Sequence, residues 1–197
     1  MRWDNLFDDL ESQLEQELGA EDIDLLAEEE RLRLGRLSLR DRLGAMVPES
    51  SGAEPVKLLL IDGTRIAIAA GAVGRDWIAG EVCGDGHRAT SCVIPIAAIA
   101  GCIPTARQTV ASVDAKPEAG VGSLASRLGL AFVLRDLCRR RAALHVRIRN
   151  ELLHGTIDRV GRDHLDLAEH EPDVPRRERA VRAIRLLPVA ELVLIRF

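Results

Sequence analysis

The chain has 197 residues, of which 47% are hydrophobic and 29% are charged, and its formal net charge is −4. Two small domains fit this length better than one large domain. No apolar run reaches the roughly 18 residues that a membrane-spanning helix requires, and the N-terminal residues are acidic where a secretion signal is basic. The sequence therefore predicts a cytoplasmic protein without a membrane partner.

Charge is distributed unevenly along the chain. Residues 1–30 contain one basic residue, Arg2, and twelve acidic residues, whereas the rest of the chain has a basic surplus. Such an asymmetry is typical of an interaction tail, an internal electrostatic partner or a solvated helix face, and these three interpretations stay open. The basic residues are 25 Arg and two Lys, a bias that with abundant Ala and Gly indicates a GC-rich bacterial genome.

Residues 1–35 are predicted to form an acidic helical arm. A spacing of three and four residues, which marks one face of a helix, joins six apolar side chains: Trp3, Leu6, Phe7, Leu10, Leu14 and Leu18. An isolated amphipathic helix is marginal in water, so this stripe must be covered. It either packs on the rest of the protein or binds a partner.

An internal repeat follows the arm. The sequence Val-Gly-Arg-Asp occurs at 73–76 and again at 160–163. When the alignment of the two segments is extended without gaps, apolar residues of one segment align with apolar residues of the other. A second block, Ile94–Ala97, matches Leu187–Ala190 at a spacing of 93 residues instead of 87. The longer spacing places extra residues in a connection, where insertions are tolerated best. We interpret these matches as two copies of one structural unit.

The first copy is predicted to occupy residues 36–103. Ser38 is a plausible cap for a short helix that ends near Met46, and Asp62-Gly63 is typical of a hairpin turn. The strand-like segments lie at 56–61, 65–72, 77–82 and 90–95, before an apolar stretch at 94–103. Residues 104–123, with two prolines and two glycines, are predicted to be an interdomain linker.

The second copy is predicted to occupy residues 124–197. A helix over about 124–140 has an apolar stripe and ends at three arginines, which suit the negative end of a helix dipole. Alternation of apolar residues with His145, Arg147 and Arg149 predicts a half-buried strand with a basic outer face. The five predicted strands are 144–149, 153–160, 164–169, 180–187 and 190–197.

A helix followed by five short strands, with Gly155-Thr156-Ile157-Asp158-Arg159-Val160-Gly161 in the second copy, resembles the Sm/LSm fold, including its Hfq branch, and the SH3-like barrels of ribosome-maturation proteins. The resemblance covers about residues 54–103 and 124–197. It implies a mainly β protein with α-helices, in which the arm precedes two tandem five-stranded barrels, each preceded by a helix. It also implies a pseudo-dimer of barrels, with possible oligomers through barrel edges.

The ligand motifs of that family are not carried over. In Sm proteins an Asp and an Asn between the second and third strands bind RNA, but Gly161 stands at the Asp position here. Asp163 and Asp166 come near the expected sites only if one residue is inserted. The second Sm motif is replaced by Arg185–Pro188 and, in the first copy, by Val93–Pro95. The resemblance therefore implies a topology and leaves the ligand open.

The layout also resembles bacterial proteins labelled Fis-family transcriptional regulators. In Leu124–Leu130, Ala and Gly four residues apart are similar to the turn of a helix-turn-helix motif. Arg135, however, falls on the expected apolar position of the recognition helix, so a helix-turn-helix is the less favoured interpretation.

Motifs for catalysis or cofactors are absent from the sequence. It contains no nucleophile elbow, phosphate loop, dinucleotide fingerprint or HExxH, so we expect no enzyme and no cofactor. The four cysteines form no CxxC pair and are predicted to be buried thiols, and Cys83, His87 and Cys92 are too few for a closed zinc site. A polar cluster from His164 to Asp173 is predicted to be a solvated strand edge.

Two hypotheses for function remain. The first is a non-catalytic adaptor or regulatory protein that binds an unknown protein partner through Trp3, Leu6, Phe7 and Leu10. The second is an RNA- or DNA-binding regulator that uses the arginine face of the second barrel, with the acidic arm as autoinhibitor. That face comprises Arg147, Arg149, Arg159, Arg162, Arg176, Arg177 and Arg179. A chain without Tyr, and with three Phe and two Trp that are mostly expected to be buried, offers few base-stacking platforms, which counts against the second hypothesis.

Overall fold

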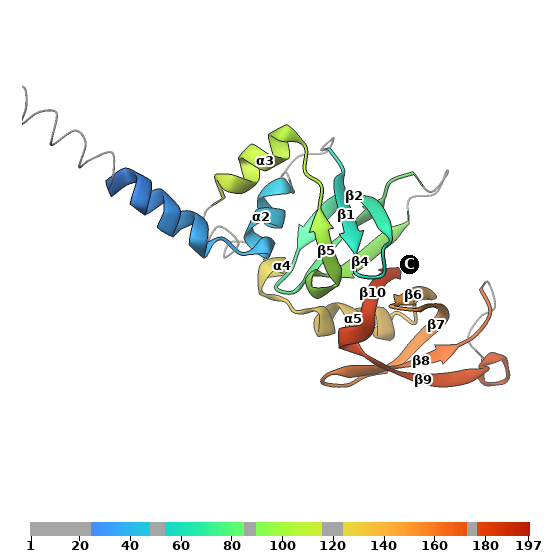
Figure 1. Cartoon of the computed structure of the whole chain (residues 1–197). Coiled ribbons are helices and arrows are strands. Elements are labelled where there is room, and N and C mark those ends of the chain that lie inside the picture. The colour runs from blue at the N-terminus through green and yellow to red at the C-terminus, as the bar shows by residue number, and fades with distance from the viewer. Residues whose placement is uncertain (1–24, 48–53, 85–89, 116–123, 173–176) are drawn as a thin grey trace, which may run out of the picture. The chain divides into compact units, whose positions relative to one another are not determined.

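A computed structural model describes residues 25–47, 54–84, 90–115, 124–172 and 177–197 (Figure 1). Its internal contacts divide the chain into two compact units, residues 1–38 and 39–197. In the first unit residues 25–36 are helical. Among the described residues, no helix is both long and apolar enough to cross a membrane.

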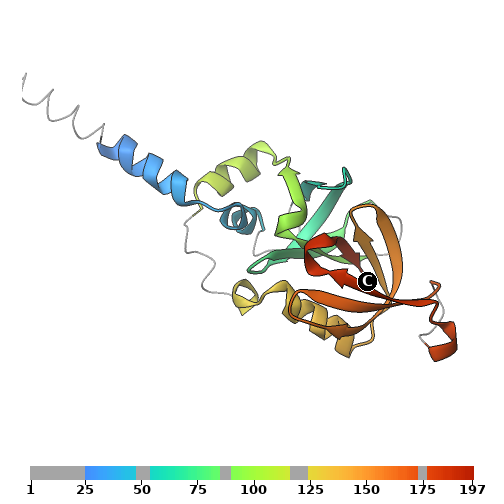
Figure 2. The same ribbon diagram turned by 60° about the horizontal axis from the view of Figure 1, so that its bottom comes forward.

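The second unit is built on one antiparallel sheet of ten strands, with helices beside it (Figures 1 and 2). The strands are β1 (Val56–Leu60), β2 (Arg65–Val73), β3 (Trp77–Val82), β4 (Ser91–Pro95), β5 (Ile99–Cys102), β6 (Leu144–Ile148), β7 (Glu151–Val160), β8 (His164–Glu169), β9 (Ala183–Pro188) and β10 (Leu192–Arg196). The α-helices are α2 (Leu39–Met46), α3 (Ala106–Val113), α4 (Leu124–Arg127) and α5 (Leu130–Arg139). Three short 3₁₀ turns are η1 (Ile96–Ala98), η3 (Glu178–Ala180) and η4 (Val189–Glu191).

The sheet does not close into barrels. Its order is β5-β1-β2-β3-β4-β10-β6-β7-β8-β9, so β5 and β9 are the two edges. The last strand, β10, pairs with β6 on one side and with β4 on the other, with Ile195 opposite Val93. The prediction of two tandem five-stranded barrels is therefore wrong, whereas a mainly β fold with α-helices is confirmed. Alternating hydrophobicity fixes which face of a strand is buried, but it does not fix which strand pairs with each edge.

The two halves of the sheet nevertheless share their strand order, β5-β1-β2-β3-β4 in one and β10-β6-β7-β8-β9 in the other. The β2–β3 ladder shifts register between Ala70 and Ala72, and the β7–β8 ladder shifts between Ile157 and Arg159. The two register shifts are 87 residues apart in the sequence, as are the two copies of the tetrapeptide. Pro95 and Pro188, which precede η1 and η4, have the same backbone angles, φ −60° and ψ 135°.

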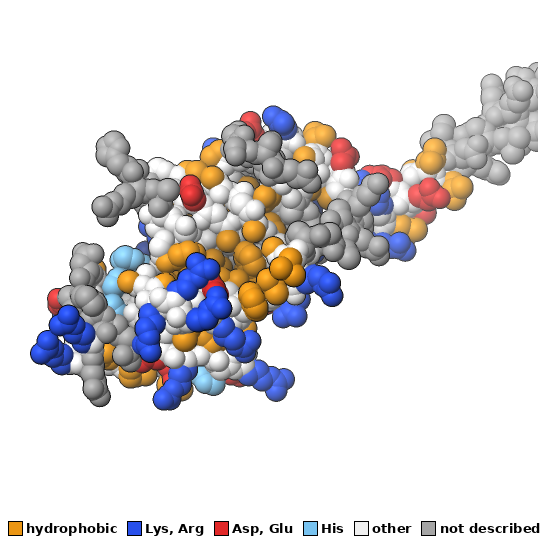
Figure 3. All heavy atoms as spheres, turned by 180° about the vertical axis from the view of Figure 1, so that it is seen from behind, with side chains coloured by type: hydrophobic (Ala, Val, Ile, Leu, Met, Phe, Trp, Pro, Cys, Tyr) orange, Lys and Arg blue, Asp and Glu red, His pale blue; other side chains and the backbone are white. Residues whose placement is uncertain are grey.

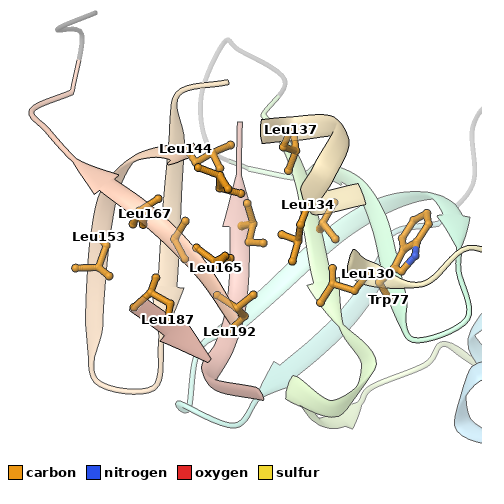
Figure 4. Close-up of a cluster of buried hydrophobic side chains, with 14 residues drawn as sticks. Trp77, Leu130, Leu134, Leu137, Leu144, Leu153, Leu165, Leu167, Leu187 and Leu192 are labelled. Carbon is orange, nitrogen blue, oxygen red and sulfur yellow. The ribbon is translucent and has the colours of Figure 1, made fainter. Parts of the chain in front are cut away.

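Each half has its own hydrophobic core, and a helix contributes to each. In the first half, Leu43 and Met46 of α2 pack with side chains of β1 to β4. In the second half, α5 lies beside the strands, and its leucines join Trp77 of β3 and the buried residues of β6 to β10 (Figures 2 and 4). The C-terminus lies between the halves because β10 joins them (Figure 1).

The predicted linker contains a helix. Thr105 and Gln108 form a capping box at the start of α3, in which each side chain accepts a hydrogen bond from the other residue's backbone N–H. Gln108 is buried and also donates to the Glu54 carbonyl at 3.1 Å. Arg42 of α2 donates to Ser112 Oγ at 3.0 Å, which ties α3 to α2. These contacts stabilise a helix where Pro and Gly content predicted none.

All four cysteines are free thiols, and of these only Cys92 is buried. Burial raises the pKa of the Cys92 thiol to about 11, despite opposing contributions from a backbone hydrogen bond of Gly80 and the charge of Arg196. A thiol with so high a pKa is inert as a nucleophile at neutral pH.

Candidate nucleic-acid interface

Helix α5 has one buried and one exposed face. Leu130, Leu134 and Leu137 are buried in the core of the second half. Phe132 is 54% exposed, and Arg135 and Arg139, three and seven residues further on, are exposed as well. That spacing places the three side chains on one helix face, directed away from the core. We call Phe132, Arg135 and Arg139 the α5 outer face.

The start of α5 is held by the first copy of the repeated tetrapeptide. The Leu130 N–H donates to Asp76 Oδ1 at 2.7 Å. This carboxylate therefore stabilises the N-terminal end of α5, which carries the positive end of the helix dipole. The Arg75 N–H and Trp77 Nε1 both donate to the Leu128 carbonyl, each at 3.0 Å. These bonds fix α5 in position relative to the sheet, so the α5 outer face is carried on an anchored helix.

Further arginines surround this face. Arg127 precedes α5, and Arg140 and Arg141 follow it; all three are exposed. Asp136 forms ion pairs with Arg139 and with Arg140, the latter at 2.7 Å. Within the described part of the chain, no ion pair joins Arg135 or Arg141 to an acidic group. Figure 3 shows Lys and Arg side chains concentrated over the second half of the unit, beside an area of hydrophobic side chains.

The arginines predicted from the sequence do not form one free basic surface. Arg147 lies 3.4 Å from the Asp62 carboxylate, which is 3% exposed. Arg149 pairs with Glu191 at 3.1 Å, and Arg159 pairs with Asp166 at 3.7 Å. Acidic neighbours therefore neutralise part of the charge that the sequence assigned to this surface.

The structure describes three of the four other arginines that were predicted to bind nucleic acid. Arg162, Arg177 and Arg179 are exposed, and no ion pair of theirs is seen among the described residues. Arg176 lies outside the described residues, as do the predicted partner-binding residues of the arm: Trp3, Leu6, Phe7 and Leu10.

The polar cluster that begins at His164 is not wholly solvated among its described residues. His170 is buried, and its Nε2 shares a hydrogen bond of 2.9 Å with Thr156 Oγ1, while its Nδ1 donates to the Glu171 carbonyl at 3.0 Å. The ring of His154 packs edge-on against both His170 and His145, with ring centroids 5.3 and 4.5 Å apart. The prediction of surface histidines was thus wrong for His170, because its two ring nitrogens find partners inside the fold.

Sequence reasoning also missed the α5 outer face. The aromatic side chains were expected to be mostly buried, yet Phe132 and Phe197 are exposed and only Trp77 among the described aromatics is buried. A helical projection of residues 130–139 would have separated Phe132 from the leucine stripe. Such a projection could not have shown that the helix face with Phe132 stays exposed in the folded protein.

The described residues contain no cluster of His, Cys, Asp and Glu that could hold a metal ion. No protein-family model, curated protein or solved structure matches this chain, so the arrangement of charge and exposure is the basis for a functional proposal.

Proposed function

We propose that this chain is a non-catalytic regulatory protein that binds single-stranded nucleic acid through the α5 outer face. The observation that carries the proposal is an exposed aromatic ring, Phe132, beside two arginines on one anchored helix. Proteins that bind single strands combine base stacking on aromatic rings with phosphate contacts from basic side chains. The α5 outer face offers both within two helical turns.

Each group has a distinct part in this proposal. The ring of Phe132 stacks on an unpaired base, which stabilises a complex by about 1–3 kcal/mol per base. Arg135 and Arg139 contact phosphates and release counterions, and Arg127, Arg140 and Arg141 extend the positive surface along the strand. Asp136 lowers the net charge of the face but also holds Arg139 and Arg140 in place.

Fluorescence anisotropy of the full-length protein with a labelled single-stranded RNA, and with a DNA of the same sequence, tests the proposal at low salt. Phe132→Ala removes one stacking platform, so its affinity should fall by at least about fivefold. Arg135→Ala combined with Arg139→Ala should weaken binding about tenfold or more.

The matched control is Arg149→Ala combined with Arg159→Ala, which removes two arginines that are already paired with Glu191 and Asp166. This control should bind as the unmodified protein does. If it loses affinity while both α5 variants keep theirs, the proposal is wrong. A form without residues 1–30 should bind more tightly if the acidic arm competes with nucleic acid for the basic surface.

The second candidate is an adaptor that binds a protein partner through the helical arm. The described end of the arm favours it, because the helix at residues 25–36 exposes four large apolar side chains, each between 41 and 63%: Leu25, Leu26, Leu32 and Leu34. Exposed apolar stripes on helices commonly seat in a groove of a partner. The contact residues of this candidate are those predicted from the sequence, Trp3, Leu6, Phe7 and Leu10.

Co-purification from cells separates this candidate from the first. Trp3→Glu combined with Phe7→Glu should abolish capture of the partner, and so should Leu26→Glu combined with Leu32→Glu. The thermal unfolding of the second unit should not change in either variant. Capture that survives both pairs of substitutions would reject the adaptor, whatever the result for nucleic acid.

A further inference from the structure

A small pocket lies on the face of β6 opposite to α5. It has a volume of about 190 Å³ and is lined by Thr90, His145, Arg147, Leu152, Leu194 and Arg196. On β6, Leu144 and Val146 are buried in the core that contains α5, so the alternating residues His145 and Arg147 point to the other side of the sheet. The pocket and the α5 outer face are therefore separate surfaces.

The strand register brings the basic residues of the pocket together. Arg196 of β10 is directly opposite His145 of β6, and Leu194 of β10 is opposite Arg147. Leu152 of β7 is opposite Arg147 on the other side. Directly opposed residues on neighbouring strands project to the same face. Two guanidinium groups and one imidazole are thus placed in one pocket by the central strands of the sheet.

One of the two arginines is positioned by a buried acid. Asp62, in the turn between β1 and β2, accepts hydrogen bonds from Thr64 N at 2.9 Å and from Thr64 Oγ1 at 2.8 Å. Its Oδ2 lies 3.4 Å from Arg147 Nη1. This ion pair restrains the side chain of Arg147 at the pocket.

The size and lining of the pocket indicate its ligand. Pockets for drug-sized molecules have volumes of about 300–1,000 Å³, so this smaller pocket suits a single compact group. Paired guanidinium groups bind phosphate oxygens through parallel charge-assisted hydrogen bonds, and the Thr90 hydroxyl and the His145 ring can add further bonds. The leucines on its walls, Leu152 and Leu194, reduce competing contact with water.

We propose that this pocket binds a phosphate group. The phosphate can belong to a small molecule, such as a nucleoside monophosphate, or to the 5′ end of a nucleic-acid strand, since both present the same dianion. This site lies on another surface than the α5 outer face, so it stands or falls independently of the proposed nucleic-acid binding there.

Calorimetric titration of the full-length protein tests the site with inorganic phosphate, with a nucleoside monophosphate, and with one oligonucleotide with and without a 5′ phosphate. We expect saturable binding that Arg147→Ala and Arg196→Ala each weaken roughly tenfold or more, because each removes charge-assisted hydrogen bonds. Arg147→Lys, which keeps the charge but loses the planar fork, should give an intermediate loss.

The controls separate this site from the rest of the surface. Arg149 is two residues from Arg147 in the sequence but pairs with Glu191, so the variant Arg149→Ala should bind phosphate normally. The double variant Arg135→Ala and Arg139→Ala should also bind phosphate normally. Tighter binding of the nucleoside monophosphate than of the 5′-phosphorylated strand identifies a small-molecule ligand, and the reverse identifies a strand end.

A measurement on the unmodified protein covers the case in which an arginine variant does not fold. The imidazole resonances of His145 should shift on addition of phosphate, whereas those of His164, outside the pocket, should not. Absence of saturable binding of every phosphate compound overturns the proposal. Binding that persists unchanged in both folded alanine variants overturns it as well.

Discussion

The same four residues, Val-Gly-Arg-Asp, form the β2–β3 connection in the first half of the sheet and the β7–β8 connection in the second. Both turns use the same hydrogen bonds: Gly74 N donates to the Trp77 carbonyl at 2.8 Å, and Gly161 N donates to the His164 carbonyl at 2.8 Å. The Asp76 carbonyl accepts a hydrogen bond from Ile96 N at 2.9 Å, and the Asp163 carbonyl accepts one from Val189 N at 2.7 Å. These two donors directly follow the equivalent prolines, Pro95 and Pro188. Local sequence thus fixes the local structure in both places.

The surroundings of the two turns differ. Asp76 holds the start of α5, and Trp77 is 5% exposed and belongs to the core of the second half. The Asp163 side chain is 85% exposed, and that of His164 is 47% exposed. Helices α4 and α5 follow the first half in the chain and dock on its turn. An identical sequence therefore supports the structure in one half and remains on the surface in the other.

Truncation of the residue after each tetrapeptide should separate the two turns most clearly. Trp77→Ala removes a buried ring and its hydrogen bond to Leu128, so it should lower the free energy of unfolding by about 3–5 kcal/mol. His164→Ala should change it by less than about 0.5 kcal/mol. Urea unfolding followed by circular dichroism measures both values, and comparable losses would contradict the assigned roles.

A smaller difference is expected for the two aspartates. Asp76→Ala leaves the N–H of Leu130 without its carboxylate, and loss of such a helix-end contact costs about 0.5–2 kcal/mol. Asp163→Ala loses only an exposed contact with His164, so its unfolding free energy should stay within about 0.5 kcal/mol of the unmodified protein. If both substitutions destabilise equally, the second turn has a structural role that its exposure does not reveal.

The hairpin turns of the two halves differ in pH dependence. Burial tends to raise the pKa of Asp62, but hydrogen bonds from the backbone and hydroxyl of Thr64 and the charge of Arg147 outweigh it and lower the pKa below its ordinary value. A lowered folded-state pKa stabilises the protein above about pH 4, and this stability is lost as the pH falls through the ordinary value and then the lowered one.

Asp62→Asn should therefore be less stable than the unmodified protein at neutral pH, and the gap should narrow as the pH falls below about 4. Arg149 stands at the corresponding place in the second half, and the side chain of its partner Glu191 is 44% exposed. Glu191→Gln should change unfolding free energy by less than about 1 kcal/mol at any pH. Thermal melts from acid to neutral pH test this, and a gap for Asp62→Asn that widens in acid would refute the assigned pKa direction.

Most elements of the fold follow from the sequence, because alternation and turn residues are local signals. The strand predicted at 56–61 is β1 at Val56–Leu60, and the one at 164–169 is β8 with the same bounds. Helix α3 was missed although Thr105-Ala-Arg-Gln108 has the capping-box pattern, because nearby Pro and Gly outweighed it. The pairing of β10 with β4 depends on tertiary structure and has no local signal.

The candidate sites were less predictable. The sequence indicated that Arg147 faces outward, but its partner Asp62 is 85 residues away and its neighbour Arg196 lies on the last strand. Ion pairs of this kind depend on strand order, which the barrel prediction had wrong. Phe132 was overlooked because an aromatic residue in an apolar helix is expected to be buried, and the sequence does not show which helix face packs against the sheet.

The salt dependence of nucleic-acid binding tests the central proposal most directly, because it counts the phosphate contacts that a surface makes. Association constants for a single-stranded RNA would be measured between about 50 and 200 mM salt for the unmodified protein and for Arg135→Ala combined with Arg139→Ala. We expect steep weakening with salt for the unmodified protein and a log–log slope shallower by about 1–2 for the variant. Equal slopes, or no salt-sensitive binding by the unmodified protein, would contradict a nucleic-acid interface on α5.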